Sequence, residues 1–379
     1  MRALRVIVVG GGIGGMAAAI ALHRRGHDVQ VWERAAAVGE VGSGLTLWPN
    51  GLRALDAIGV GAQVRSRAMA DTEGGIRDRS GRWLTRTDTG KVADRYGPVV
   101  AVHRADLFDI LRTVLGEDRL RLGVTVNGVD IEDLPVRVLY AGGAETADLV
   151  IGADGLRSVV RTAVCPHARP PRYAGYTAWR MITEPLPDLR QGGQIWGSGE
   201  IFGIVPLADH RVYMFGAVNA AEGQRAPDGE FAEVRRRFGA WPDPVPRLLD
   251  AVSPDSVMRH DIYHLPDLPT FVRGRVALLG DAAHAMTPNM GQGANLALED
   301  AVSLAALLDN GEIDDALRRY DALRRPRTRA LAHRSRRIGT VAQWSWPPAV
   351  RVRDTALRLM PGWAMPRAFA GALDWTPPA

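Results

Sequence analysis

The hydrophobic positions at the start of the chain follow two different periods. Residues 4–9 are a short, β-branched apolar run, residues 16–25 are rich in alanine, and residues 28–32 are a second apolar run that ends at Glu33. Short apolar runs bounded by glycines are typical of buried strands, whereas an alanine-rich stretch favours a helix. This order predicts a β-α-β unit, with the glycines between residues 10 and 15 in its first turn.

The pattern changes further along the chain. We expect a glycine-rich loop at residues 41–47, followed by a helix that Pro49 opens and that runs to Ile58. Residues 66–102 alternate between apolar and polar positions with turn signals between them, which predicts antiparallel strands. A helix is predicted at residues 104–115, and strands are predicted at residues 136–140 and 147–153.

A second, sheet-based lobe is predicted next. Its strands are expected at residues 173–182, 194–196, 201–205 and 211–218, before helices at residues 231–238 and 244–252. A buried strand at residues 275–279 and a long helix at 293–308 then resume the first layout, and helix continues to about residue 337. We expect the tail, rich in Trp and Pro, to pack against the protein rather than to contact a membrane.

We therefore predict a mixed α/β fold in which a Rossmann-like domain is interrupted by a β-sheet domain and followed by a helical C-terminal region. The nucleotide-binding domain is assigned residues 1–67, 98–165 and 266–340, and the sheet domain residues 68–97 and 166–265. Residues 341–379 form the C-terminal region.

Composition narrows the class of protein. The 379 residues carry 47 basic and 42 acidic side chains, and Lys91 is the single lysine. The basic residues are scattered rather than gathered on one segment, which disfavours nucleic-acid binding. Cys165 is the single cysteine and no stretch of 18 apolar residues occurs, so we expect a cytoplasmic protein without disulfides or transmembrane segments. No His or Cys pair has metal-ligand spacing, so no metal site is predicted.

The glycine turn carries the first chemical signal. Gly10, Gly12 and Gly15 form a G-x-G-x-x-G fingerprint between a strand and a helix, where the turn is tight and a pyrophosphate can approach the backbone. The helix N-terminus offers free N–H groups to the phosphates. Glu33 follows at the end of the second strand, where its carboxylate can accept hydrogen bonds from a ribose. This motif by itself fits FAD as well as NAD.

Two later motifs point to FAD. Residues 153–161 resemble the DG motif, and residues 280–293 resemble the GD motif, of the FAD-dependent aromatic hydroxylases, or class A flavoprotein monooxygenases. The three motifs occur in the expected order, and the resemblance covers essentially the whole chain. Residues 172–176, 239–241 and 272–281 are most similar to the branch of salicylate hydroxylase, 3-hydroxybenzoate 6-hydroxylase and FAD-dependent urate hydroxylase.

The resemblance assigns residues to the cofactor. Asp281 follows a buried strand, where a carboxylate needs hydrogen-bond donors; the family places a ribityl hydroxyl there, and a helix N-cap is the alternative. Arg104 is expected beside the flavin, while Asp154 and Arg161 are expected to support the pyrophosphate, although Arg161 could equally be an ion-pair partner. His284 is expected to belong to the cofactor loop rather than to catalysis. The implied cofactor-binding residues are Gly10, Gly12, Ile13, Gly14, Gly15, Glu33, Arg34, Gly44, Leu45, Arg104, Asp154, Arg161, Gly280, Asp281, Pro288, Gly291, Gly293, Ala294 and Asn295.

The substrate residues are expected on the sheet lobe that faces the flavin. Tyr213 is the first candidate, because its phenol could hydrogen-bond or deprotonate a substrate hydroxyl, although a half-buried strand tyrosine is also ordinary. Tyr213 and Pro288, which opens the loop beside the flavin, are the positions assigned to catalysis. Ile201 stands where the urate hydroxylases have a substrate-binding arginine, which argues against urate and for a less polar aromatic or polycyclic substrate, as in secondary metabolism. The predicted substrate residues are Leu47, Trp196, Phe202, Tyr213 and Phe215.

The resemblance also implies a reaction. NADH or NADPH reduces FAD, oxygen reacts to give a flavin C4a-hydroperoxide, and one oxygen atom is transferred to an activated aromatic ring. Two alternatives stay open: an FAD oxygenase that performs epoxidation or oxidative decarboxylation, and an FAD-binding ligand sensor without turnover. A monomer or homodimer is expected, with a small aromatic molecule as the ligand.

Overall fold

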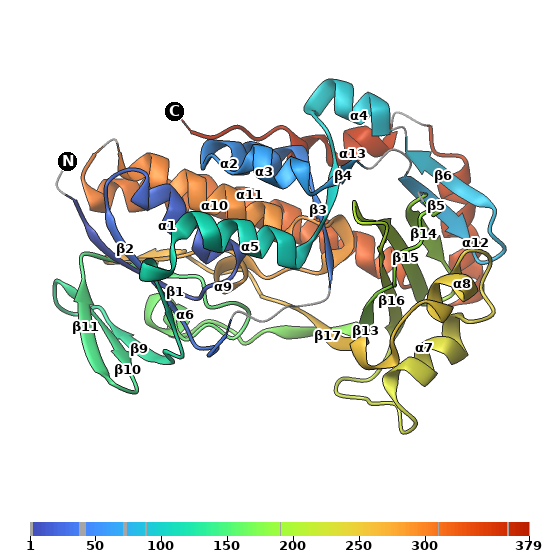
Figure 1. The fold of residues 1–379 in the computed structure, drawn as a ribbon, viewed down its shortest axis with the longest axis horizontal. Coiled ribbons are helices and arrows are strands. Elements are labelled where there is room, and N and C mark those ends of the chain that lie inside the picture. The colour runs from blue at the N-terminus through green and yellow to red at the C-terminus, as the bar shows by residue number, and fades with distance from the viewer. Residues whose placement is uncertain are drawn as a thin grey trace.

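The computed structural model describes residues 3–37, 43–70, 74–87, 89–189, 191–309, 311–361 and 364–378. Residues 41 and 42 of the expected glycine-rich loop lie outside these ranges. The described chain forms two lobes that lie side by side along the long axis of the molecule (Figure 1).

The predicted β-α-β unit forms the centre of a six-stranded sheet. Strand β1 (Arg5–Val9) leads through helix α1 (Ile13–His23) to the parallel strand β2 (Asp28–Glu33). The strand order is β18-β19-β12-β1-β2-β8, and only the edge strand β18 is antiparallel to its neighbour among the described pairs. The remaining strands are β8 (Leu120–Leu122), β12 (Leu149–Gly152), β18 (Val272–Arg273) and β19 (Val276–Leu278).

Both faces of this sheet are covered. Helices α1, α5 (Arg104–Leu115) and α10 (Gly293–Leu308) lie on one face, and a three-stranded sheet lies on the other (Figure 1). That small sheet consists of β9 (Val126–Asp130), β10 (Val136–Tyr140) and β11 (Gly143–Ala147). Because apolar side chains from all three layers join one core, α1 is buried on nearly all sides.

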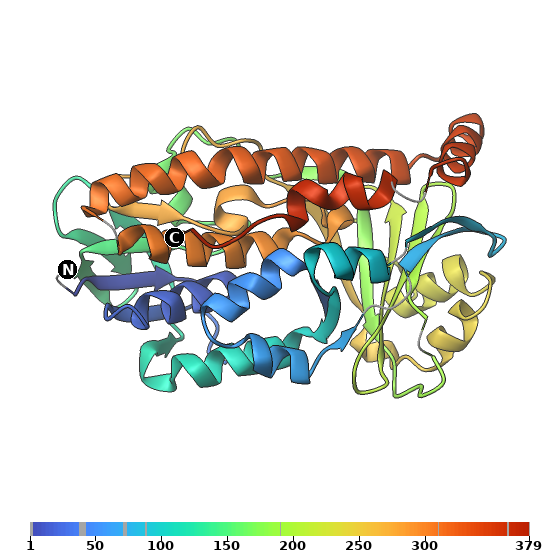
Figure 2. The ribbon, with the colours of Figure 1, turned by 90° about the horizontal axis from the view of Figure 1, so that it is seen from above.

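A seven-stranded sheet builds the second lobe, with the order β17-β13-β16-β15-β14-β5-β6. One of its faces packs against helices α7 (Glu230–Phe238) and α8 (Val245–Asp250), and the other face looks toward the first lobe (Figure 2). Its strands are β5 (Gly74–Asp78), β6 (Trp83–Thr87), β13 (Arg172–Ile182), β14 (Gly193–Trp196), β15 (Glu200–Pro206), β16 (Val212–Asn219) and β17 (Met258–His264).

A third sheet between the lobes corrects two sequence predictions. The segment expected to be a loop forms strand β3 (Gly44–Leu47), which pairs with β7 (Val100–His103), and β7 also pairs with β4 (Met69–Ala70). Helix α4 (Thr89–Tyr96) occupies part of the segment that was expected to contain strands. Glycine has a low strand propensity, so the glycine-rich segment that forms β3 does not resemble a strand in sequence. In the second case, the short alternating segments around α4 conceal its helical periodicity.

Short helices connect these layers: α2 (Pro49–Ala57), α3 (Gly61–Ser66), α6 (Val160–Val164), α9 (Asp281–His284) and the 3-10 turns η1 (Glu117–Arg119), η2 (Pro254–Ser256) and η3 (Pro288–Met290). The C-terminal region is helical, with the long α11 (Ile313–Ala342) followed by α12 (Pro347–Arg358) and α13 (Ala364–Leu373). Arg53 of α2 donates hydrogen bonds of 2.7 Å to the carbonyl oxygens of Leu373 and Trp375, so the chain end packs against the first lobe. Among the described residues, no helix combines the length and the apolar character needed to cross a membrane.

Candidate active site

A cavity of about 420 Å³ lies where the two lobes meet. The glycine turn, the GD segment and the loop before α10 line one end, and residues of β13–β16 line the other. The predicted cofactor residues on its wall are Gly12, Ile13, Gly14, Gly15, Gly44, Leu45, Arg104, Gly280, Asp281, Pro288, Gly291, Gly293 and Ala294. The sequence motifs therefore meet in one place, although they are far apart along the chain.

The glycine fingerprint has the geometry that a dinucleotide requires. Gly10 has a φ of +108°, and an added Cβ on Gly15 would lie 2.0 Å from the carbonyl oxygen of Gly10, so neither position accepts a side chain. At Gly12, by contrast, an added Cβ would meet none of the described atoms within 4 Å. The backbone of Gly12 is therefore open to the cavity, as close approach of a pyrophosphate demands.

Glu33 lies beside the same turn. Its carboxylate accepts a hydrogen bond of 2.8 Å from the Gly11 N–H and one of 2.9 Å from the Ala35 N–H. These contacts hold the carboxylate at the end of β2, next to the fingerprint. Arg34 is exposed and does not line the cavity.

Two helix N-termini face the cavity. Helix α1 begins after Gly12 and helix α10 begins after Gln292, and the described residues give neither helix a side-chain cap or an acidic residue in its first turn. The first N–H groups of such helices attract negative charge. One end of the cavity thus offers two anion-binding positions, which fits a pyrophosphate at α1 and the pyrimidine edge of a reduced flavin at α10.

Asp281 is the exposed carboxylate between these helices. It lines the cavity, and within the described chain it accepts no hydrogen bond, so it is available to a ligand hydroxyl. The helix N-cap alternative is wrong, because Gly280 occupies the cap position of α9.

A buried network of ion pairs and hydrogen bonds holds the GD segment (residues 280–293) in place. Asp300 of α10 accepts a hydrogen bond of 3.0 Å from the Gly280 N–H, lies 2.5 Å from Nε2 of His284, and pairs with Arg324 at 2.7 Å. Burial by itself would raise the pKa of Asp300, but His284 and Arg324 outweigh burial and hold that pKa well below its usual range. His284 therefore contacts Asp300 behind the GD segment and does not line the cavity.

Three predicted cofactor residues act at a distance from the cavity wall. Asp154 accepts hydrogen bonds from the Ser158 hydroxyl at 2.6 Å and from two N–H groups at the start of α6. Arg161 donates to the carbonyl oxygens of Ala282 and Leu156 at 3.0 and 2.8 Å, which ties the DG segment to the GD segment. Asn295 is buried and links α10 to β3 through the Thr46 carbonyl oxygen. None of these three side chains lines the cavity, and each bonds to the protein itself, so the structure shows them holding the DG segment, the GD segment and α10 in place.

The opposite end of the cavity combines an apolar wall with Arg180, and Arg104 interacts electrostatically both with this end and with Asp281 of the cofactor end. Tyr213, the predicted catalytic residue, lies here, and Arg180 donates a hydrogen bond of 3.4 Å to its hydroxyl oxygen. Arg180 has no ion-pair partner among the described carboxylates, and Nε of Arg104 is buried without a described hydrogen-bond partner. Burial and the nearby Arg180 lower the pKa of Arg104. The two guanidinium groups therefore give this part of the cavity a positive potential.

Sequence reasoning missed Arg180, Tyr176 and Asn289, which also line the cavity. Tyr176 accepts a hydrogen bond of 2.9 Å from Asn289, and burial raises the pKa of Tyr176 to about 12. Alternation along β13 could have found Arg180, because it shares a sheet face with Tyr176 and Ala178 while Trp179 and Met181 face the other way.

Two of the predicted substrate residues, Phe202 and Leu47, do not line the cavity. Trp196 and Phe215 line the cavity, but Phe202 is fully buried on the opposite face of the sheet, where its ring packs 5.2 Å from Phe238 of α7. Leu47 is buried in the core of the first lobe. Neighbouring Ile201 faces the cavity instead of Phe202, since side chains alternate between the faces of a strand.

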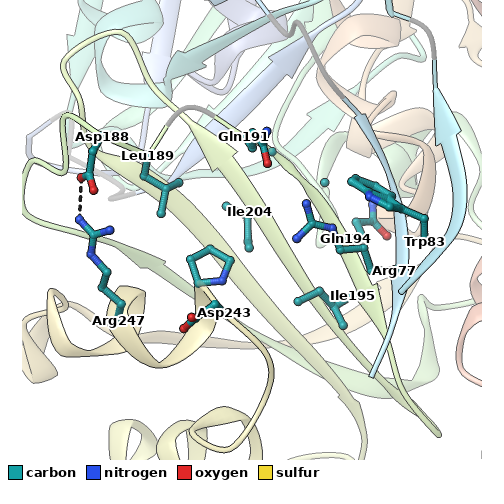
Figure 3. A pocket seen from close by; sticks show the side chains of 13 residues that line it. Arg77, Trp83, Asp188, Leu189, Gln191, Gln194, Ile195, Ile204, Asp243 and Arg247 are labelled. Carbon is teal, nitrogen blue, oxygen red and sulfur yellow. Dashed lines mark hydrogen bonds and ion pairs between the residues drawn. The ribbon is translucent and has the colours of Figure 1, made fainter. Parts of the chain in front are cut away.

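A second pocket of about 310 Å³ lies at the edge of the seven-stranded sheet (Figure 3). Arg247 donates a hydrogen bond of 2.6 Å to Asp188 there, and the Arg77 guanidinium lies 4.2 Å from the centre of the Trp83 ring. Gln194 of β14 lines this pocket and the large cavity. None of the described motif residues lines the second pocket, so the cavity between the lobes is the candidate active site.

The fold and the site together define a flavin-dependent oxygenase, with a dinucleotide turn, a GD segment and a side-chain pocket around one cavity. A family model described as FAD binding domain matches residues 3–335. This chain belongs to that family, within the class A flavoprotein monooxygenases or aromatic hydroxylases. The protein is accordingly an FAD-dependent monooxygenase that uses NAD(P)H and oxygen.

Individual relatives cover almost the whole chain. Aurachin C monooxygenase/isomerase of Stigmatella aurantiaca is 37% identical over 362 residues, which are 94% of each protein. The 2-heptyl-3-hydroxy-4(1H)-quinolone synthase of Pseudomonas aeruginosa is 31% identical over 369 residues, again 94% of each. The structure of Klebsiella pneumoniae HpxO with FAD and uric acid aligns with a TM-score of 0.91 at 31% identity and covers 97% of this chain and 96% of that one.

Proposed function

We propose that this monooxygenase hydroxylates an apolar bicyclic or polycyclic aromatic molecule that carries an acidic oxygen. The observation that carries this proposal is the pair Arg180 and Tyr213 at the substrate end of the cavity, set in a wall that is largely apolar apart from Gln194, Tyr176 and Asn289. That wall is formed by Trp196, Ile201, Val205, Phe215, Ala217 and Ile338.

Arg180 and Tyr213 have complementary roles in this proposal. The Tyr213 hydroxyl oxygen accepts a hydrogen bond from Arg180, so its own proton is free to donate to a substrate oxygen. The guanidinium adds positive charge that favours the deprotonated substrate. A ring with an oxyanion is richer in electrons, and such a ring accepts an electrophilic oxygen atom more readily. The two side chains thus bind the substrate and activate it.

The cofactor end has a separate task. We propose that the N-terminus of α1 holds the FAD pyrophosphate, that Glu33 accepts hydrogen bonds from the ribose, and that Asp281 accepts one from a ribityl hydroxyl. Bound FAD would carry electrons from NAD(P)H to molecular oxygen, which would supply the transferred oxygen atom. Pro288 and the first N–H groups of α10 are proposed to hold the flavin edge and stabilise its negative charge, while Arg104 lies beside it.

The chemistry of the wall guides the choice of substrate. Urate is small and polar and needs many hydrogen-bond partners, whereas the position of the arginine expected in urate hydroxylases is Ile201 here. Two relatives are named for aurachin C and for a 2-heptyl-3-hydroxy-4(1H)-quinolone. Quinolones are flat, mostly apolar and carry an acidic N–H or hydroxyl, so we propose them as the substrate class to test first.

The test measures NADH and NADPH consumption by the FAD-loaded protein with 4-quinolones, 2-alkyl-4-quinolones, urate, salicylate and a polycyclic phenol. We expect a quinolone to stimulate consumption and to gain one oxygen atom, as read by product mass. Stimulation by urate alone would contradict the assignment of the apolar wall. Product analysis by NMR separates ring hydroxylation from epoxidation or decarboxylation.

Three further assignments remain proposals. The first is the division into a cofactor domain and a substrate domain, which strands β5, β6 and β13–β17 support by sharing one sheet. The second is a cytoplasmic location, which rests on the single cysteine. The third is a monomer or homodimer, for which the mass of the protein in solution is the measurement.

A further inference from the structure

Helix α12 is apolar on its outer side as well as on its inner side, where Leu357 packs against the core of the second lobe. On its inner side, Arg353 is 3% exposed and donates hydrogen bonds of 2.9 Å to the carbonyl oxygens of Ala342 and Gly197. The Arg353 guanidinium also lies 5.4 Å from the centre of the Trp196 ring, in the wall of the active-site cavity. These contacts anchor the helix firmly to the second lobe, beside β6.

The outer side of this helix is apolar. Trp346, Val352 and Leu359 are 68%, 66% and 77% exposed, which makes them the three most exposed large hydrophobic residues in the described part of the chain. Val352 and Leu359 are two turns apart and lie on one face of the helix. Pro348, Thr355 and Ala356 are the other exposed residues of this face, so it carries no charged side chain along the described helix.

Positive charge borders this apolar face. Arg351 and Arg358 are exposed on the same edge of the helix, and Arg358 also pairs with Asp78 at 2.7 Å. The acidic residue of the helix, Asp354, is bonded to the buried Arg353 on the inner side. A surface that meets the outer side of α12 therefore encounters hydrophobic side chains with arginines alongside them.

A surface helix normally keeps its outer side polar, so the additional, outward apolar stripe of α12 indicates a surface that is covered by a partner. A stable interface with a second copy buries about 800 Å² on each side and takes about 20 residues. Val352 and Leu359 on this face, with Trp346 at the N-cap of the helix, are three large apolar side chains, which is too few. A helix lying in the plane of a lipid surface needs just such a narrow apolar face, flanked by Arg and with Trp at the headgroup level.

We propose that α12, together with Trp346 and Leu359, binds the surface of an anionic lipid bilayer. The apolar side chains enter the headgroup region, and Arg351 and Arg358 contact the lipid phosphates. The proposal concerns a peripheral contact and does not depend on the identity of the substrate. It favours the alternative to the sequence expectation that the Trp- and Pro-rich tail packs against the protein rather than contacting a membrane.

The experiment sediments the full-length, FAD-loaded protein with two kinds of vesicle, pure phosphatidylcholine and phosphatidylcholine with phosphatidylglycerol. We expect binding to the anionic vesicles, weakened by salt. The double variant Val352→Ser/Leu359→Ser should bind more than about tenfold less well, and Arg351→Gln a few-fold less well. The matched control is Leu134→Ser, because Leu134 is 59% exposed in the turn between β9 and β10, far from α12 in sequence. This control should bind like the parent protein.

Flavin content and NADH oxidation of each variant verify that the fold is intact. The proposal is overturned if the parent protein fails to bind anionic vesicles, or if Leu134→Ser weakens binding as much as the double variant. It is also overturned by analytical ultracentrifugation if the parent protein forms a dimer that the double variant abolishes while lipid binding is unaffected, because the face would then bind a second copy.

Discussion

The two ends of the active-site cavity are built in different ways. The cofactor end consists of backbone: glycines that exclude a side chain, two uncapped helix N-termini, and a GD segment held by the fully buried Asp300 and Arg324. The substrate end consists of side chains, such as Tyr213, Arg180 and Trp196, that project from one face of a sheet. A backbone cradle fits one ligand and tolerates little change, whereas side chains on a rigid sheet can be exchanged without altering the fold.

This difference separates two kinds of consequence. A change at the cofactor end should affect folding or flavin content, and every substrate equally. A change at the substrate end should leave the holoenzyme intact and alter which molecule is oxidised, and how fast. The predictions that follow can confirm or break this separation.

The largest effect is expected from Asp300→Asn. This change leaves Arg324 and His284 buried without their anion, so the free energy of unfolding should fall by about 3–5 kcal/mol and flavin should be lost. Urea unfolding measures the first effect, and the ratio of flavin to protein measures the second. Asp255→Asn, on an exposed 3-10 turn, is the control and should change stability by less than about 0.5 kcal/mol.

The same variant tests a dependence on pH. Because the pKa of Asp300 is lowered in the folded protein, its stabilisation is complete above the pKa of an unfolded aspartate, about 3.9, and is lost as the pH falls toward the folded value. The difference in unfolding free energy between parent and variant should therefore be constant near neutrality and shrink in acid. A difference that grew in acid would mean that Asp300 is not the stabilising anion.

Asp281→Ala is expected to have the next largest effect. Asp281 is exposed, so the protein should fold normally, but FAD affinity should fall by about 10- to 100-fold because a charge-assisted hydrogen bond is lost. Titration of the apoprotein with FAD measures this, with thermal unfolding of the apoprotein as the control. Full affinity in the variant would remove Asp281 from the cofactor site.

The comparison also explains which parts were predictable from the sequence. The fingerprint is a local strand-turn-helix signal, so its glycines and Glu33 could be placed at once. Asp154 and Arg161 match a motif, but a motif does not reveal that their polar atoms bond to the protein itself. The substrate end depends on which face of each strand meets the cavity, and that is set by long-range strand pairing. Phe202 is misplaced for this reason, whereas the alternation along β13 could have pointed to Arg180.

Changes to Tyr213 and Arg180 test whether the substrate end of the cavity can be altered without affecting flavin binding. Tyr213→Phe removes the proposed donor to the substrate oxygen, and Arg180→Met removes the positive charge with little change in length; each should lower kcat/KM by about 10- to 100-fold. Flavin content should stay at the parent level in both variants. A loss of flavin in either would show that the two ends of the cavity are coupled, and unchanged turnover of the true substrate would remove that residue from the reaction.

The smallest expected effect comes from a matched pair of phenylalanines on adjacent strands. Phe215 lines the cavity and Phe202 faces the helices. The same change to leucine therefore tests substrate binding at Phe215 and core packing at Phe202. Phe202→Leu should lower the free energy of unfolding by about 1 kcal/mol, because the packing against Phe238 is lost, and should leave KM unchanged. Phe215→Leu should alter KM for the substrate a few-fold, because it changes the shape of the wall, with less effect on stability. Urea unfolding and steady-state kinetics on both proteins decide the matter: if Phe202→Leu altered KM more than Phe215→Leu, the substrate would bind on the other face of the sheet, and the pairing of the two lobes around one cavity would not define the active site.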